Sequence, residues 1–229
     1  MSDFDAVCFD LDGTLCVQDQ EFVDLWDAAF ELAGVDPAIA PADVADVDAD
    51  AVPTVESPEA FYEELFLAAA REAGADVDRA TATSVAEAYL EVHDPAAVSF
   101  RPGAREALAA ARERGPVGLV TNGGEATQTA KLDALGVRDA FDAAVYCDPR
   151  AGVEPKPDPT PLRMALDRLG AAPGETLLVG DSLPADVRGA HDAGMRSAWV
   201  PVGDPEGDPE PEPTHRLDSM AAVAALLRR

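Results

Sequence analysis

Lysine is almost absent from this 229-residue chain, which contains only Lys131 and Lys156 against 44 aspartates and glutamates. The formal net charge is −27 at pH 7. A surface this acidic repels nucleic acids and anionic membranes, so we expect neither as a partner. Such a charge is typical of adaptation to a salt-rich cytoplasm, where screening removes the self-repulsion. The composition therefore predicts a halophilic, cytoplasmic protein.

Cysteines, histidine ligand pairs and long apolar runs are also scarce. The three cysteines are an odd number and form no Cys-x-x-Cys pair, which argues against a disulfide framework or a zinc site. No run approaches the roughly 18 apolar residues of a membrane span. The first residues lack the basic and apolar segments of a signal peptide. These absences predict an intracellular protein with reduced thiols.

Five short apolar runs have the composition of buried strands in a parallel sheet that helices cover on both faces. They lie at residues 6–11, 117–121, 143–147, 176–180 and 197–200. Helical patterns alternate with them at residues 103–114, 126–135, 161–169 and 184–193, and a last one covers 219–227. This alternation predicts an α/β fold with a doubly wound parallel sheet, which binds its ligands where the strands end.

Residues 17–95 interrupt this alternation and have helical patterns throughout. Three helices are expected, one over the apolar positions of 22–33, one starting at Ser57-Pro58 and one over 85–92, with a loop or short helix at 36–56. The segment is too long for a simple crossover connection. We therefore predict a helical cap domain at residues 17–95, inserted into a core domain formed by residues 1–16 and 96–229.

The stretch VCFDLDGTLC places two carboxylates, Asp10 and Asp12, at the end of the first predicted strand. Carboxylates this close repel each other unless a cation lies between them. The Asp-x-Asp pattern recurs elsewhere in this acidic chain, but only here does it follow an apolar strand. Gly13 then allows a tight turn. The context therefore indicates a functional pair of carboxylates.

Three further polar groups follow predicted strands. Thr121 and Asn122 precede two glycines, whose backbone N–H groups can hold a phosphate. Lys156 lies between two prolines, which is unusual for a surface charge in a chain that avoids lysine. Asp181 and Asp186 follow the run at 176–180, where a helix N-cap is the alternative role for Asp181. Strand ends therefore gather several carboxylates near one lysine.

Clustered oxygen ligands of this kind suit Mg²⁺, which retains several waters and bridges to phosphate. The cation would offset the repulsion between the carboxylates, and Lys156 would add a second positive charge. We therefore predict Mg²⁺ as the cofactor.

These motifs, in this order, resemble the four motifs of the haloacid dehalogenase-like (HAD) superfamily. They are DLDGT at residues 10–14, Thr121-Asn122, Lys156-Pro157, and Asp181 with Asp186, and the resemblance covers residues 6–201. The helical insertion resembles the C1 cap of the phosphoglycolate phosphatase-like branch. The resemblance implies a phosphatase, a Mg²⁺-dependent hydrolase of a small phosphorylated metabolite that acts through an aspartyl-phosphate intermediate.

The resemblance also implies a role for each site residue. Asp10 would be the nucleophile, and Asp12 would protonate the leaving alcohol and then deprotonate the hydrolytic water. The implied metal ligands are Asp10, Asp12 through its backbone carbonyl, Asp181 and Asp186. The implied phosphate ligands are Thr121, the Asn122 amide and Lys156, and Lys156 would also balance the charge on Asp10. The cap would exclude water and contact the substrate.

Other chemistries of the superfamily can be compared with these residues. A haloalkanoate dehalogenase does not keep the second acid, so Asp12 argues against that activity. A phosphonate hydrolase needs a cap lysine, and residues 17–95 contain none. A β-phosphoglucomutase-like phosphotransferase remains an alternative. So does a non-hydrolytic phospho-aspartate signalling module similar to a receiver domain, although about 120 residues suffice for such a domain and none has a cap.

The substrate itself is not identified by the sequence. Few cations occur in the predicted cap, so phosphoglycolate is one possibility among sugar phosphates, nucleotides and cofactors. The acidic surface disfavours self-association at low salt, and we therefore expect a monomer or a weak homodimer.

Overall fold

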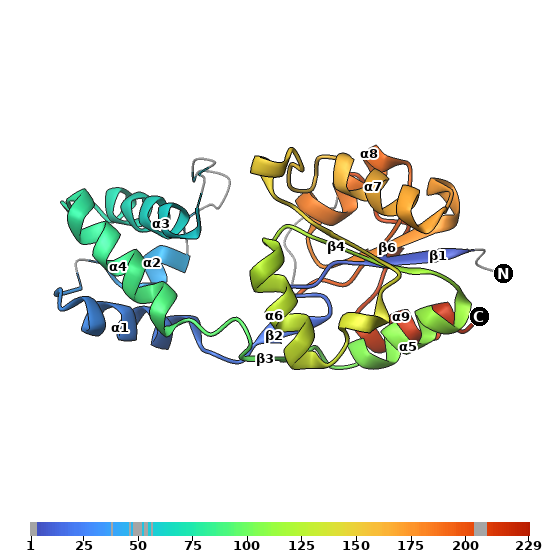
Figure 1. The fold of residues 1–229 in the computed structure, drawn as a ribbon, viewed down its shortest axis with the longest axis horizontal. Coiled ribbons are helices and arrows are strands. Elements are labelled where there is room, and N and C mark those ends of the chain that lie inside the picture. Colours follow the sequence, from blue (N-terminus) through green and yellow to red (C-terminus); the bar gives the residue numbers. More distant parts are fainter. Residues whose placement is uncertain are drawn as a thin grey trace. The chain divides into compact units, whose positions relative to one another are not determined.

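A computed structural model describes residues 4–37, 39–45, 47, 52, 55, 57–203 and 210–229. The chain divides into two compact units, which we describe separately (Figure 1). The core unit comprises Met1–Gln18 and Val98–Arg229, and the inserted unit comprises Asp19–Ala97. Part of the loop predicted at 36–56 lies outside the described residues.

A six-stranded sheet forms the centre of the core unit, with the strand order β5-β4-β1-β6-β7-β8. Its strands are β1 (Ala6–Phe9), β4 (Val117–Thr121), β5 (Ala143–Tyr146), β6 (Thr176–Gly180), β7 (Arg196–Trp199) and β8 (His215–Arg216). All neighbouring strands are parallel. The chain builds outward from β1 to β5 and then returns to β6 on the other side, so the strand order reverses at β1. This confirms the predicted doubly wound α/β fold, to which the short strand β8 is an addition.

Helices cover both faces of this sheet (Figure 1). They are α5 (Ala104–Arg114), α6 (Glu125–Leu135), α7 (Thr160–Leu169), α8 (Arg188–Ala193) and α9 (Met220–Leu227). Val7 and Phe9 of β1 pack in one apolar cluster with residues of α5, α6 and α9. Cys8 points to the other face, into a cluster with residues of α7 and α8. Burial on both faces explains why the strands are continuous apolar runs in the sequence.

The helix predicted at 184–193 is divided in the structure. Leu183–Val187 forms a π-helical turn, and α8 begins only at Arg188. The Ser182 side chain accepts a hydrogen bond from the Ala185 N–H group and so caps this turn. The wider turn places Asp186 at the end of β6, as described below.

A short antiparallel ribbon connects the core unit to the inserted unit. It pairs β2 (Cys16–Gln18) with β3 (Val98–Phe100), and Cys16 lies opposite Phe100. The chain leaves the core unit through one strand of this ribbon and returns through the other. The sequence analysis did not predict these two strands, since three residues are too few to show an alternating pattern.

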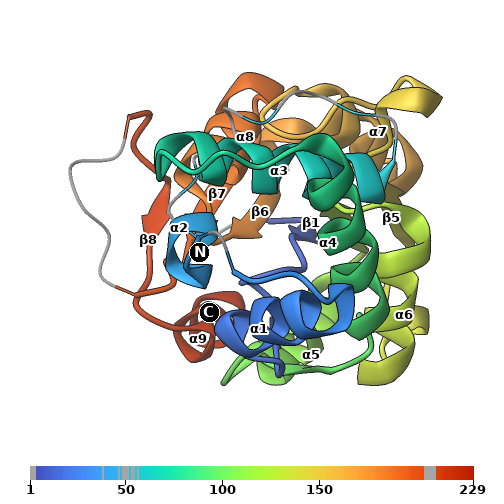
Figure 2. The same cartoon turned by 90° about the vertical axis from the view of Figure 1, so that its left-hand side faces the viewer.

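The inserted unit is helical, as predicted. Its helices are α1 (Phe22–Ala33), α2 (Pro41–Ala45), α3 (Pro58–Glu72) and α4 (Arg79–Val92), and α4 packs against both α1 and α3 (Figure 2). The Ser57 side chain caps α3, with Pro58 at its first position. Trp26 is fully buried and packs against Phe66 and Tyr89 in an aromatic core. Among the described residues of the whole chain, no helix has the length and apolar character required to cross a bilayer.

Candidate active site at the carboxyl edge of the sheet

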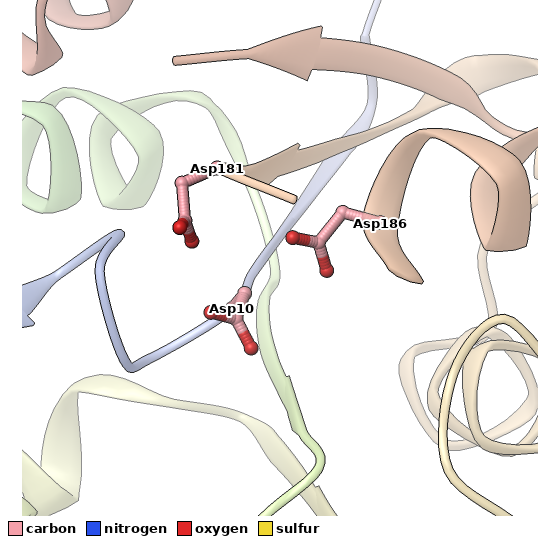
Figure 3. A group of neighbouring side chains, drawn as sticks. All are labelled: Asp10, Asp181 and Asp186. Carbon is pink, nitrogen blue, oxygen red and sulfur yellow. The ribbon is translucent and has the colours of Figure 1, made fainter. Parts of the chain in front are cut away.

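Three carboxylates converge where β1 and β6 end. Asp10 follows β1, Asp181 follows β6, and Asp186 lies in the π-helical turn (Figure 3). One oxygen of each lies within 4.8 Å of the others. Figure 3 shows the three side chains turned toward one another. This donor set fits a hard divalent cation, which takes oxygen ligands, and Asp10, Asp181 and Asp186 would hold it.

Two glycines allow the carboxylates to approach the backbone. A Cβ on Gly180 would lie 2.3 Å from Cγ of Asp186. Gly13 has a φ of +74°, and a Cβ there would lie 2.5 Å from Oδ2 of Asp181. A side chain at either position would therefore displace a carboxylate of the site.

Lys156 is the buried cation of the site. Its Nζ donates hydrogen bonds to Oδ1 of Asp10 and to Oδ1 of Asp186, both at 2.7 Å, and to the Val120 carbonyl at 2.8 Å. The lysine loop is held by Asn122, whose side chain donates to the Lys156 carbonyl at 2.9 Å and accepts from the Lys156 N–H group at 2.8 Å. The Asn122 side chain therefore positions the lysine.

The electrostatics of the cluster show a surplus of negative charge. Burial raises the pKa of Asp10 to about 7, against the lowering effect of Lys156. Burial also raises the pKa of Asp181, although a hydrogen bond from Thr14 opposes the rise. Burial lowers the pKa of Lys156, but Asp10 and Asp186 raise it more, so that its pKa lies above the ordinary value. A divalent cation would favour the ionised form of both aspartates.

Asp12 lies apart from this cluster and contacts helix α6. Its Oδ2 accepts a hydrogen bond from Nε2 of Gln128 at 2.7 Å, and its Oδ1 accepts one from Nζ of Lys131 at 2.6 Å. Gln128 also donates to Oγ1 of Thr121 at 2.5 Å. The sequence analysis missed Gln128 and Lys131. The scarcity of lysine, which drew attention to Lys156, would have identified Lys131 as well.

The loops around the site are held by side-chain hydrogen bonds, most of them to backbone carbonyls. Thr14 donates to Oδ1 of Asp181 at 2.8 Å, and the Trp199 indole donates to the Asp181 carbonyl at 2.7 Å. The Arg101 guanidinium donates to the Gly13 carbonyl at 2.8 Å and also to carbonyls of the loop after β7. These contacts connect the turn at Gly13 and Thr14 with Asp181 and with the loop after β7.

All seven predicted site residues line one cavity of about 420 Å³ in the core unit. They are Asp10, Asp12, Thr121, Asn122, Lys156, Asp181 and Asp186. The structure therefore brings together residues that are up to 176 positions apart in the chain (Asp10 to Asp186). Their individual roles stay predictions.

The fold and the site together define an α/β protein with a cluster of carboxylates that could hold a cation, at the switch point of a parallel sheet, where such folds bind ligands. Residues 4–194 match the family described as haloacid dehalogenase-like hydrolase. The chain therefore belongs to the haloacid dehalogenase-like hydrolases, as the motifs predicted.

Two similar proteins are named as phosphatases. A phosphoserine phosphatase of Thermus thermophilus is 40% identical over 151 residues, which are 64% of this chain and 58% of that protein. A phosphoglycolate phosphatase of Rhodospirillum rubrum is 37% identical over 197 residues, 83% of this chain and 76% of that protein. The match thus spans less than two thirds of the length of the Thermus relative.

Solved structures share the fold at lower identity. A predicted phosphoglycolate phosphatase from Haemophilus somnus has a TM-score of 0.75 at 20% identity, with 99% of each chain covered. A putative β-phosphoglucomutase from Thermotoga maritima has a TM-score of 0.74 at 21% identity, with 98% of this chain and 99% of that chain covered. At this identity the likeness shows the fold alone.

Proposed function

We propose that this protein is a Mg²⁺-dependent phosphomonoester hydrolase that acts on a small phosphorylated metabolite through an aspartyl-phosphate intermediate. One observation carries the proposal: Asp10, Asp181 and Asp186 converge in the same cavity as buried Lys156. Relatives named as phosphoserine and phosphoglycolate phosphatases support the same reaction class. Their substrates differ, so the proposal stops at the class of substrate.

In the first half of the reaction, a carboxylate oxygen of Asp10 attacks phosphorus in line with the ester oxygen. A bond forms between Asp10 and phosphorus, and the bond from phosphorus to the ester oxygen breaks. The leaving alkoxide takes a proton from the Asp12 carboxyl group. Lys156, which is already hydrogen-bonded to Asp10 at 2.7 Å, keeps the nucleophile oriented and balances its charge.

In the second half, the Asp12 carboxylate takes a proton from a water molecule. The resulting hydroxide attacks phosphorus, the bond to Asp10 breaks, and inorganic phosphate leaves. Asp12 regains its proton and Asp10 its carboxylate, so atoms and charges balance over the cycle. The two carboxylates thus have separate roles, one covalent and one in proton transfer.

The phosphoryl group would be held by the Thr121 hydroxyl, the backbone N–H of Asn122 and Lys156. The side chain of Asn122 binds the Lys156 backbone, so the part of Asn122 proposed to bind the phosphate is its main-chain N–H group. Mg²⁺, when bound by Asp10, Asp181, Asp186 and the Asp12 carbonyl, would supply charge neutralisation for the phosphoryl oxygens.

The remaining parts of the proposal concern the setting of the enzyme. Residues 17–95 would act as a cap that excludes water and contacts the substrate, and the helical character of the inserted unit supports this. The net charge of −27 supports a salt-rich cytoplasm and a monomer or weak homodimer.

The test is phosphate release from a panel of phosphomonoesters at high KCl, with Mg²⁺ or with EDTA, for the wild type and for Asp10→Asn. We expect turnover that requires Mg²⁺ and that falls at least about 10³-fold in Asp10→Asn. Asp167→Asn, an exposed residue on α7, is the matched control and should keep full activity. Absence of turnover with stable labelling of Asp10 by acetyl phosphate would instead favour the signalling or phosphotransferase alternatives.

A further inference from the structure

Helix α6 presents two polar side chains to Asp12. Gln128 and Lys131 are three residues apart, a spacing that places both on the same face of a helix. They bind different oxygens of the same carboxylate, Oδ2 at 2.7 Å and Oδ1 at 2.6 Å. Two separate donors on two oxygens define the plane of the carboxylate as well as its position.

Gln128 connects Asp12 to the predicted phosphate-binding hydroxyl. The side chain is fully buried, and its amide nitrogen donates both to Asp12 and to Thr121. Its Oε1 atom is buried without a hydrogen-bond partner among the described residues. Leaving such an acceptor unpaired costs about 1–3 kcal/mol, so packing alone would favour an apolar residue here. The contacts to Asp12 and Thr121 are therefore the reason to have an amide at this position.

Lys131 is the second of the two lysines in the chain. Arginine supplies every other cationic side chain except histidine, yet both lysines contact carboxylates of the DLDGT motif. Lysine carries a compact charge that binds a single oxygen, whereas a guanidinium binds in a fork. At Asp12, a single-point contact to Oδ1 leaves room for Gln128 on Oδ2.

We propose that Gln128 and Lys131 are positioning residues for proton transfer by Asp12; this inference rests on the proposed function. They hold the Asp12 carboxyl group so that its proton can pass to the leaving alkoxide. Gln128 also contacts Thr121 and so fixes the distance between Asp12 and the phosphate site. Neither residue lines the cavity of the predicted site residues. Lys131 acts through Asp12, and Gln128 acts through Asp12 and Thr121.

The proposal predicts an effect that depends on the leaving group. An alkyl phosphate releases a strongly basic alkoxide that needs the proton of Asp12, whereas p-nitrophenolate leaves without one. The kcat/KM value reports steps up to phosphoryl transfer, so it isolates the first use of Asp12. We expect Lys131→Met and Gln128→Met to lower kcat/KM for the best alkyl phosphate of the panel about 10²-fold. For p-nitrophenyl phosphate we expect Lys131→Met to change kcat/KM within about 3-fold, and Gln128→Met to lose less than on the alkyl phosphate.

Controls separate positioning from general structural damage. Lys131→Arg should recover part of the loss, because it restores a cationic donor. Asp133 lies on α6 and forms an ion pair with Arg138. Asp133→Asn removes this ion pair and should leave kcat/KM for both substrates unchanged. Equal losses on both substrates, or no loss on the alkyl phosphate, would overturn the proposal.

One further variant tests Gln128 without replacing it. A Cβ on Gly123 would lie 2.4 Å from Cδ of Gln128. Gly123→Ala should therefore displace the Gln128 side chain and lower kcat/KM for the alkyl phosphate. If the wild type hydrolyses neither ester, or if Asp10→Asn keeps its activity, the proposed function fails before these variants are compared.

Discussion

The two lysines of the chain lie in contrasting parts of one site. The inner cluster, Asp10, Asp186 and Lys156, is closed to solvent, with side-chain exposures of 11%, 3% and 1%. In the outer cluster, Asp12, Gln128 and Lys131, the Asp12 side chain is 53% exposed and Lys131 is 11% exposed. Both contain a short lysine–carboxylate contact, so they differ in burial more than in chemistry.

This difference indicates different tasks. A buried ion pair is costly to break, because the remaining partner is left desolvated, whereas an exposed pair contributes little to stability. The inner cluster is thus a structural element as well as the set of groups proposed to bind the metal and react. The outer cluster can change its contacts at small cost to the fold, which suits the proton-transfer role proposed for Asp12.

Replacement of the buried lysine should have the largest effect on stability. Lys156→Met leaves Asp10 and Asp186 buried without their cation, and we expect a loss of about 3–5 kcal/mol in the free energy of unfolding. Lys131→Met removes the partially exposed contact and should cost no more than about 1 kcal/mol. Urea unfolding of both variants and the wild type at high KCl with EDTA measures this difference. Equal losses in the free energy of unfolding would show that the two lysine contacts contribute equally to stability.

Binding of Mg²⁺ should have the second-largest effect on the free energy of unfolding. If Mg²⁺ binds only the folded protein, a concentration of 100 times its Kd adds about 2.7 kcal/mol to the free energy of unfolding. We expect a matching rise in Tm for the wild type. The rise should be lost in Asp181→Asn but kept in Lys131→Met, because Lys131 contacts the Asp12 side chain and none of the three clustered carboxylates. A Tm that Mg²⁺ leaves unchanged in the wild type would argue against the cation site.

A smaller loss is expected from an added methyl group beside the inner cluster. Gly180→Ala places its Cβ 2.3 Å from Cγ of Asp186, and overpacking of this kind costs about 1–3 kcal/mol. Gly124→Ala adds the same methyl group in open space and is the control. Thermal unfolding of both variants compares them. Tolerance of Gly180→Ala would mean that the inner cluster is less tightly packed than the structure shows.

The smallest effect concerns a titrating group outside both clusters. Burial lowers the pKa of His215 on β8, with Arg196 adding to the effect. A histidine with a lowered pKa stabilises the folded state above its unfolded pKa of about 6.5, and this contribution is lost as the pH falls. His215→Gln should therefore lose less stability than the wild type between pH 7.5 and pH 5.5. Identical losses in urea unfolding at the two pH values would contradict this.

Much of the fold and of the inner cluster could be predicted because its parts are local in the sequence. Apolar runs marked the five longer strands. Asp10 and Asp186 of the inner cluster follow two of these strands, and Lys156 lies in the loop before α7. Gln128 and Lys131 of the outer cluster were missed because they lie within a helix whose pattern does not show which face meets Asp12. Strands of two or three residues, such as β8, and the π-helical turn before α8 also leave no periodic signal.

The ribbon of β2 and β3 has a consequence for how such chains can vary. Because Cys16 and Phe100 are opposite each other, the ends of the inserted segment are already brought together by the core unit. The entropy of closing a loop rises only by about 0.6 kcal/mol for each doubling of its length. An inserted segment of very different length between β2 and β3 would therefore change the free energy of unfolding of the core unit little. The architecture thus permits one catalytic core to carry insertions of many sizes.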